Sequence, residues 1–149
     1  MVDTSDFLQA DDVYKVISTI HAVASGHHTD DAIERYIGVD SEGRQGRYYR
    51  LAAEKLGFVT LVGHNNNTQL TAQGAAFARQ PTAQQQVSMQ SAIMSLPVFR
   101  AAAAYIQRDR PTLEQLRHWF IRYYPGAEST AERRFSTFVI YLRYCGYQF

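Results

Sequence analysis

Arginine side chains recur at helical spacing in the middle of the chain, where they could recognise phosphates or bases. Arg44, Arg47 and Arg50 are three residues apart, so on a helix they would lie along one side. The guanidinium group presents a planar fork of donors that matches phosphate oxygens and guanine edges. Gln45 and Tyr48 stand between these arginines. The pattern favours nucleic-acid recognition, although an arginine-rich composition is equally typical of GC-rich coding.

A second arginine cluster lies near the end of the chain. Arg133 and Arg134 are followed by Thr137, whose hydroxyl suits a phosphate contact. Arg133 and Thr137 are four residues apart, so they would share a helix face. We predict that Arg133, Arg134 and Thr137 form a second binding surface. The alternative is that one of these arginines pairs with Glu128 or Glu132.

Charge is distributed unevenly along the chain. The 149 residues carry 15 basic and 14 acidic side chains, with a formal net charge of +1. Residues 1–42 hold nine acids and two bases, a charge of −7, whereas residues 43–149 hold thirteen bases and five acids, a charge of +8. The near-neutral total therefore does not exclude a nucleic-acid partner, and we expect the acidic part to face away from a duplex and to orient the protein on it.

Hydrophobic periodicity predicts the elements that must position the first cluster. Residues 10–24, about 29–38 and 42–56 have helical spacing, with Asp40 or Ser41 as the cap of the third helix. The pattern then changes to strands at 58–62 and 68–70, which turn at 63–67, and a short helix follows at 72–79. The first half is thus expected to contain three helices, a β-hairpin and a fourth helix.

The second half is expected to contain three more helices. The glutamine-rich stretch 80–90 is typical of a connector and is the best domain boundary. Helices are predicted at 91–107, from Thr112 to the residue before Pro125, and from Ser129 to Tyr144. Capping boxes would start the last two, with Gln115 and Glu132 as their acidic or amide partners. Residues 145–149 are typical of a helix end and the first residues of a strand that does not continue.

Two stretches resemble a known family of DNA-binding modules. The segment 37–49, which contains Arg-Gln-Gly-Arg-Tyr-Tyr, leads through Ala-Ala-Glu-Lys-Leu-Gly to Leu-Thr-Ala-Gln-Gly at 70–74. It is similar to the winged-helix modules of prokaryotic restriction endonucleases and related defence proteins, in which the first motif is the third helix and the last closes the wing. Residues 129–137 resemble the third helix of the partner domain in such proteins.

The resemblance implies a mainly α fold with a short β-hairpin, an α+β class. It would consist of a winged-helix domain at 1–80 and a second, winged-helix-like domain at 81–149 whose wing is short or truncated. The expected function is double-stranded DNA recognition, as the DNA-binding part of a restriction or defence protein. The alternatives are a winged-helix module for protein–protein interaction or dimerisation, and a transcription regulator.

Candidate DNA contacts follow from this arrangement. Arg44, Gln45, Arg47 and Tyr48 would read bases or phosphates at the start of the third helix, and Arg50 would clamp the DNA backbone. The neighbouring Gly43 and Gly46 would permit a backbone to approach closely, or would merely loosen the start of a solvated helix. The wing would add contacts from His64, Asn65, Asn66 and Asn67, although asparagine-rich tips are also ordinary turns.

Catalytic and metal-binding patterns are weak in this sequence. The only lysines, Lys15 and Lys55, have no strand acid two residues before them, as a restriction nuclease centre would need. The run from His27 to Asp31 is more typical of a solvated helix start than of a zinc site. We therefore expect a non-catalytic chain with no metal and no cofactor.

The remaining expectations concern location and partners. One cysteine, Cys145, cannot form a disulfide within the chain. The sequence has no signal-peptide pattern and no run of eighteen apolar residues, so we expect a cytoplasmic protein without a membrane partner. The expected partners are double-stranded DNA and either a second copy in a homodimer or a fused or associated nuclease.

Overall fold

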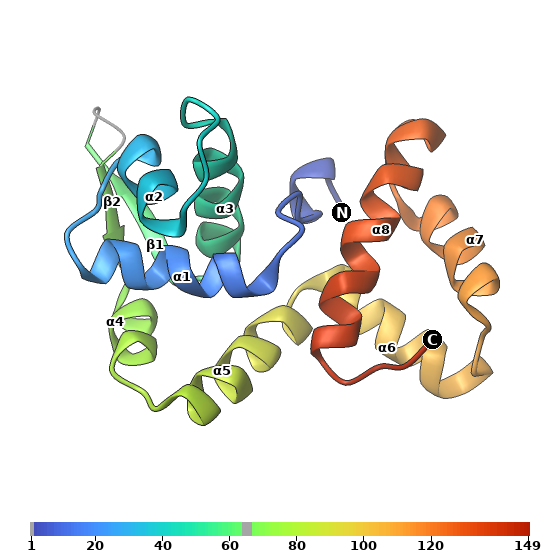
Figure 1. Ribbon diagram of the computed structural model, residues 1–149. Coiled ribbons are helices and arrows are strands. Elements are labelled where there is room, and N and C mark those ends of the chain that lie inside the picture. The colour runs from blue at the N-terminus through green and yellow to red at the C-terminus, as the bar shows by residue number, and fades with distance from the viewer. Residues whose placement is uncertain (1, 64–66) are drawn as a thin grey trace.

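The fold is mainly α-helical with one small antiparallel sheet. The computed structural model describes residues 2–63 and 67–149 (Figure 1). Within this range a 3-10 helix at Thr4–Asp6 is followed by α1 (Val13–Ala24), α2 (Asp30–Ile37), α3 (Arg44–Lys55), β1 (Val59–Val62), β2 (Asn67–Leu70), α4 (Ala72–Ala78), α5 (Thr82–Met94), α6 (Pro97–Asp109), α7 (Leu113–Tyr123) and α8 (Glu128–Tyr144). The α+β class with a short hairpin is confirmed.

The first half is built around α1. This helix contacts α2, α3, β2 and α4, and its residues Val16 and Ile20 are fully buried against them. On α2, Ile33 is likewise fully buried. On α3, the small buried side chain of Ala53 lets α3 approach α1 closely. The order of three helices, a hairpin and a fourth helix is that predicted for residues 1–80.

The hairpin is attached to the loop between α1 and α2. Val59 pairs with Leu70 and Val62 with Asn67 across the two strands. On the outer edge of β2, the Thr68 N–H donates to the His28 carbonyl at 2.8 Å, and His28 Nδ1 donates to the Thr68 carbonyl at 2.8 Å. His28 is thus joined to β2 by one backbone and one side-chain hydrogen bond beside the two-stranded sheet, which explains its place before α2 without a metal.

The second half has an aromatic core. Phe120 of α7 and Phe138 of α8 have ring centroids 4.7 Å apart, and Phe99 of α6 lies 5.1 Å from Phe138. Because each ring removes a large apolar area from water, this cluster is the main force that holds α6, α7 and α8 together.

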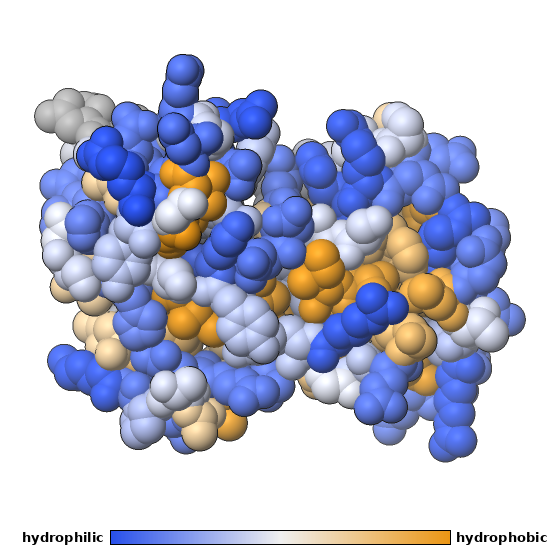
Figure 2. Space-filling view, viewed as in Figure 1, coloured by the Kyte–Doolittle hydropathy of each residue, from blue (hydrophilic) through white to orange (hydrophobic). Residues whose placement is uncertain are grey.

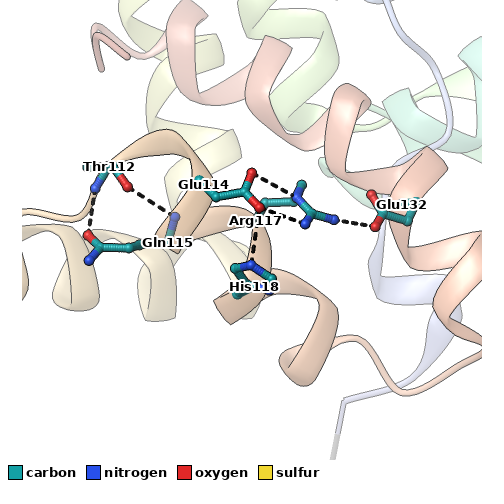
Figure 3. Close-up of polar contacts among 6 residues, drawn as sticks. All are labelled: Thr112, Glu114, Gln115, Arg117, His118 and Glu132. Carbon is teal, nitrogen blue, oxygen red and sulfur yellow. Dashed lines mark hydrogen bonds and ion pairs between the residues drawn. The ribbon is translucent and has the colours of Figure 1, made fainter.

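The start of α7 matches the sequence prediction. Thr112 and Gln115 form the capping box that the sequence predicted for α7 (Figure 3). Arg117 of α7 donates to Glu114 at 2.7 Å and to Glu132 of α8, and so joins the two helices near their starts (Figure 3).

The predicted connector at 80–90 is helical, so that prediction was wrong. Pro81 is the cap of α5 and cannot continue α4, whereas the glutamines that follow are good helix formers. Gln85 is buried, and its Nε2 donates to the Phe77 carbonyl at 2.9 Å. The predicted helix at 91–107 is divided, because Pro97 begins a new helix at its first position.

Both ends of the last helix differ from the prediction. α8 begins at Glu128 with Ala127 as its cap, and no side chain caps it, so Ser129 is not a capping residue. Glu132 pairs with Arg117 in place of a capping box. After Cys145, Gly146 has φ +97°, and the Tyr147 N–H donates back to the Leu142 carbonyl at 3.1 Å. Among the described residues no strand follows α8, so the expected incipient strand is not formed.

The helices form two groups, α1–α4 and α6–α8, and more than one segment connects them. α5 leads from α1–α4 to α6–α8, and the N-terminal segment lies between α3 and α8 (Figure 1). Phe7 of this segment packs into the second group, 4.7 Å from Tyr124 and 5.6 Å from Phe120 between ring centroids. The buried apolar residues therefore form one continuous core across the predicted boundary. None of the helices in the described ranges is long and apolar enough to cross a membrane.

Candidate nucleic-acid interface

The start of α3 is capped by a side chain from α2. Gly43, at φ +84°, occupies the cap position and offers no side chain. Glu34 takes its place: its carboxylate accepts from the Ser41 N–H, from the Ser41 hydroxyl at 2.7 Å, and from the Gly43 and Gly46 N–H groups at 3.3 and 3.0 Å. The charge of Glu34 also suits the positive end of the helix dipole.

This carboxylate is ionised although it is only 3% exposed. Burial by itself would raise the pKa of Glu34, but the hydrogen bonds from Gly46, Ser41 and Gly43 outweigh it and lower the pKa to about 2. The first turn of α3 therefore depends on a buried negative charge.

Gly46 is explained by packing within the protein. A Cβ at this position would lie inside contact distance of the Asp30 carbonyl oxygen and 3.1 Å from the carbonyl carbon. Gly43 is constrained by its positive φ and by Asp31, whose Oδ1 would lie 2.7 Å from an added Cβ. The two glycines thus allow α2 and α3 to approach each other, and the prediction that they make room for a DNA backbone was wrong.

Arg50 is turned into the protein. It is 5% exposed, and its Nε and Nη2 donate to the two carboxylate oxygens of Asp30 at 3.1 and 3.2 Å. Its Nη1 also lies 3.7 Å from Glu54. This two-pronged pair fixes α3 against α2. The prediction that Arg50 clamps a DNA backbone is contradicted by its burial.

The other predicted residues of α3 face outward. Arg44 and Arg47 are exposed, Tyr48 is 36% exposed, and Gln45 is half-buried. Neither arginine has an ion-pair partner within residues 2–63 and 67–149. Both line a hollow of about 460 Å³ whose wall also contains Asp31 and Glu42. α3 therefore presents two free guanidinium groups one turn apart, with acids beside them.

Only one predicted wing residue can be placed. Asn67 begins β2, is half-buried, and accepts a hydrogen bond from Gln69 Nε2 at 2.9 Å. His64, Asn65 and Asn66 lie outside the described residues, so the predicted wing contacts remain predictions.

The predicted cluster on α8 is divided between two environments. Arg133 is exposed, with its Nη2 3.4 Å from the Thr130 hydroxyl. Arg134 is half-buried, and Thr137 is only 7% exposed. Arg133 and Thr137 are one turn apart on α8, as predicted, but Thr137 is buried, so the prediction that it contributes to a binding surface was wrong. In the described part of the chain, neither arginine pairs with an acid.

The sequence analysis missed the segment that lies beside α3. A cleft of about 490 Å³ separates residues 5–9 from the outer face of α3, and its walls include Phe7, Leu8 and Leu51. Figure 2 shows the face of the whole molecule that is viewed in Figure 1, with hydrophobic residues across its middle and hydrophilic ones at its outer edges. In the sequence, the indication that this segment packs against the rest of the protein was the apolar pair Phe7–Leu8 within an otherwise polar start of the chain.

Acidic residues of that segment contact α3 directly. Lys55 Nζ lies 2.6 Å from Asp6 Oδ1, and the Tyr49 hydroxyl donates to Asp11 at 3.2 Å. Part of the acidic N-terminal region therefore lies against α3, and the expectation that this region faces away from a duplex stays a prediction.

The residues that the structure describes include the run from His27 to Asp31, which the sequence analysis weighed as a zinc site and judged more typical of a helix start. Within them no group of three His, Cys, Asp or Glu side chains is arranged to hold an ion. His28 bonds to Thr68, and Asp30 bonds to Arg50.

Comparison with known proteins gives a family. No curated protein sequence and no solved structure matches the chain. Residues 15–145 match the family model described as a domain of unknown function, DUF7226. The match begins within α1, ends just after α8, and includes both arginine clusters. The chain therefore belongs to the DUF7226 family.

Proposed function

We propose that this protein binds double-stranded DNA through the first turns of α3. The observation that carries the proposal is the pair Arg44 and Arg47, both exposed and both without an acidic partner among the described residues. They stand at the start of the third helix of a three-helix unit followed by a hairpin, the position from which a winged helix reads the major groove.

The anchoring of α3 supports this function. Glu34 holds the N–H groups of its first turn, and Arg50 holds its middle to Asp30. A helix fixed in this way presents Arg44 and Arg47 in one orientation, which reduces the entropy lost on binding. Gln45 and the Tyr48 hydroxyl would add hydrogen bonds to bases or phosphates.

The wider context is also part of the proposal. The His28–Thr68 edge and the hairpin support a winged-helix topology for residues 13–70. α6, α7 and α8 would be a second, related unit that lacks a wing. On the resemblance of the Arg-Gln-Gly-Arg-Tyr-Tyr motif, the chain would be the non-catalytic DNA-binding part of a restriction or defence protein in the cytoplasm.

Salt-dependent DNA binding tests the proposal. Fluorescence anisotropy is measured with a random duplex of about 24 base pairs at about 50 and about 200 mM salt. If α3 neutralises two to four phosphates, affinity should fall roughly 10- to 150-fold between these conditions. The double variant R44A/R47A should weaken binding at low salt about 10-fold or more and lower the salt slope by about 2.

A matched control distinguishes the loss of this site from the loss of two positive charges elsewhere on the protein. R79A/R100A removes two other exposed arginines, one just after α4 and one on α6, and should leave the affinity nearly unchanged. Equal losses in both double variants, or no salt-sensitive binding by the natural chain, would overturn the proposal.

A second candidate function is self-association through the cleft beside α3. Tyr48 and Leu51 are 36% and 37% exposed there, opposite Phe7 and Leu8. Light scattering after size exclusion measures this: a dimer that L51R converts to a monomer would favour this candidate, and a monomeric natural chain would remove it.

A further inference from the structure

Two arginines far apart in sequence lie on either side of the same short segment. Arg44 of α3 lines a hollow together with Gln9, Ala10 and Asp11. Arg134 of α8 lines a small cavity of about 10 Å³ together with Phe7 and Leu8. Because Leu8 and Gln9 are consecutive, residues 7–11 separate the two arginines.

This arrangement limits the distance between the arginines. Five residues of extended chain reach at most about 14 Å from the first Cα to the last. The hollows that the two arginines line therefore adjoin one segment no longer than about 14 Å, a length comparable with the roughly 12 Å width of the major groove. In Figure 1 the first turns of α3 and of α8 both lie along the upper edge of the molecule, with the N-terminal segment between them.

The acids of the intervening segment are already engaged. Asp6 pairs with Lys55, Asp11 accepts from the Tyr49 hydroxyl, and Asp12 caps α1. On the α8 side, Glu132 pairs with Arg117. None of these carboxylates forms an ion pair with Arg44 or Arg134 among the described residues, although Asp11 lines the hollow beside Arg44.

Arg134 has the environment of an anion contact. It is half-buried and has no hydrogen-bond or ion-pair partner in the described part of the chain. A guanidinium partly withdrawn from water gains from a charged acceptor, because charge-assisted hydrogen bonds are stronger there.

We infer that α3 and α8 contact one duplex at the same time, with Arg44 and Arg134 on phosphates that flank a single groove. This inference rests on the proposed DNA-binding function and adds a second contact region to it. Residues 7–11 would then form the base of one continuous phosphate-binding surface.

The test uses the full chain and the same random duplex, with R134Q and R134K as the variants. R134Q keeps the length of the side chain beside Phe7 and Leu8 but removes its charge, whereas R134K keeps the charge. We expect R134Q to weaken binding about 5-fold and to lower the salt slope by about 1, and R134K to restore the slope. R143A, which removes an exposed charge near the other end of α8, is the matched control and should change neither.

Stoichiometry is the second measurement. Sedimentation at saturating DNA should give one duplex per protein chain. Two duplexes per chain would overturn the inference, because the two helices would then bind separately. An unchanged salt slope in R134Q, together with the expected loss in R44A/R47A, would overturn the inference and leave the proposed function standing. If the natural chain binds no DNA, the proposed function itself fails.

Discussion

α3 and α8 both carry candidate DNA-binding arginines, but different forces hold them in place. α3 is fixed by buried polar groups, namely the Glu34 carboxylate and the Arg50–Asp30 pair. α8 is fixed by aromatic packing of Phe135 and Phe138 against Phe120. Buried charges orient a helix sharply but cost stability when one partner is lost, whereas apolar packing involves no titrating group and is insensitive to pH. The two surfaces should therefore respond differently to the same perturbations.

The largest loss of stability should come from the aromatic core. Phe120 is fully buried and packs against four rings, those of Phe7, Tyr124, Phe135 and Phe138, so F120A should lower the free energy of unfolding by about 4 kcal/mol. Urea denaturation followed by circular dichroism measures it. The loss should be the same at pH 5 and pH 8, and a strong pH dependence would contradict the apolar account of this half.

G46A should break the contact between α2 and α3. The added methyl group would overlap the Asp30 carbonyl, which is backbone and cannot move aside cheaply. We expect a loss of about 3 kcal/mol, at the upper end for overpacked sites. G26A is the control: unlike Gly46, Gly26 has a positive φ, but it has open space around it, so it should lose only about 1 kcal/mol. Equal losses would remove the steric explanation.

E34Q tests the polar anchor of α3. The amide keeps the shape of the side chain but loses the charge and turns a donor toward the N–H groups of Ser41, Gly43 or Gly46. We expect a loss of about 2 kcal/mol at pH 7 in urea denaturation. DNA affinity should also fall, because the first turn of α3 carries Arg44 and Arg47. A stable E34Q with unchanged DNA binding would show that the cap does not position the arginines.

The pH dependence of stability distinguishes the two halves further. The pKa of Glu34 is lowered from 4.5 to about 2 on folding, so its contribution is complete above about pH 4.5 and is lost as pH falls toward 2. The natural chain should lose more stability over this interval than E34Q does. Because other carboxylates titrate equally in both proteins, the difference between the two pH profiles reports Glu34. Parallel profiles would contradict the assignment.

The smallest effect concerns the acids beside α3. Glu42 lines the hollow that contains Arg44 and Arg47, so E42Q should raise DNA affinity about 2- to 3-fold at low salt, and less at high salt. D109N, at the far end of α6, is the control and should leave the affinity unchanged. An equal gain in both variants would show that the affinity depends on the net charge of the protein and not on the position of Glu42.

Local patterns were sufficient for most of the secondary structure. The apolar spacing of α1 predicted its buried residues Val16 and Ile20, and the run of β-branched residues followed by turn residues predicted the hairpin. The capping box at Thr112 was predictable because its two reciprocal hydrogen bonds join residues three apart in the sequence. The errors at Ser129 and at 80–90 arose where a distant partner decided the outcome: Glu132 bonds to Arg117, and Gln85 bonds to the end of α4.

The candidate site shows the same difference between features set by local sequence and features set by distant partners. The sequence by itself determined that arginines recur on α3 and α8, since composition and helical spacing are local properties. Only the tertiary structure decided that Arg47 faces solvent whereas Arg50 is buried, because Asp30 on another helix supplies its partner. It likewise decided that Gly46 serves packing and that residues 7–11 lie between Arg44 and Arg134. The physical reason is that a side chain's charge is fixed by its type, but its partner and its exposure depend on segments that meet only in the folded chain.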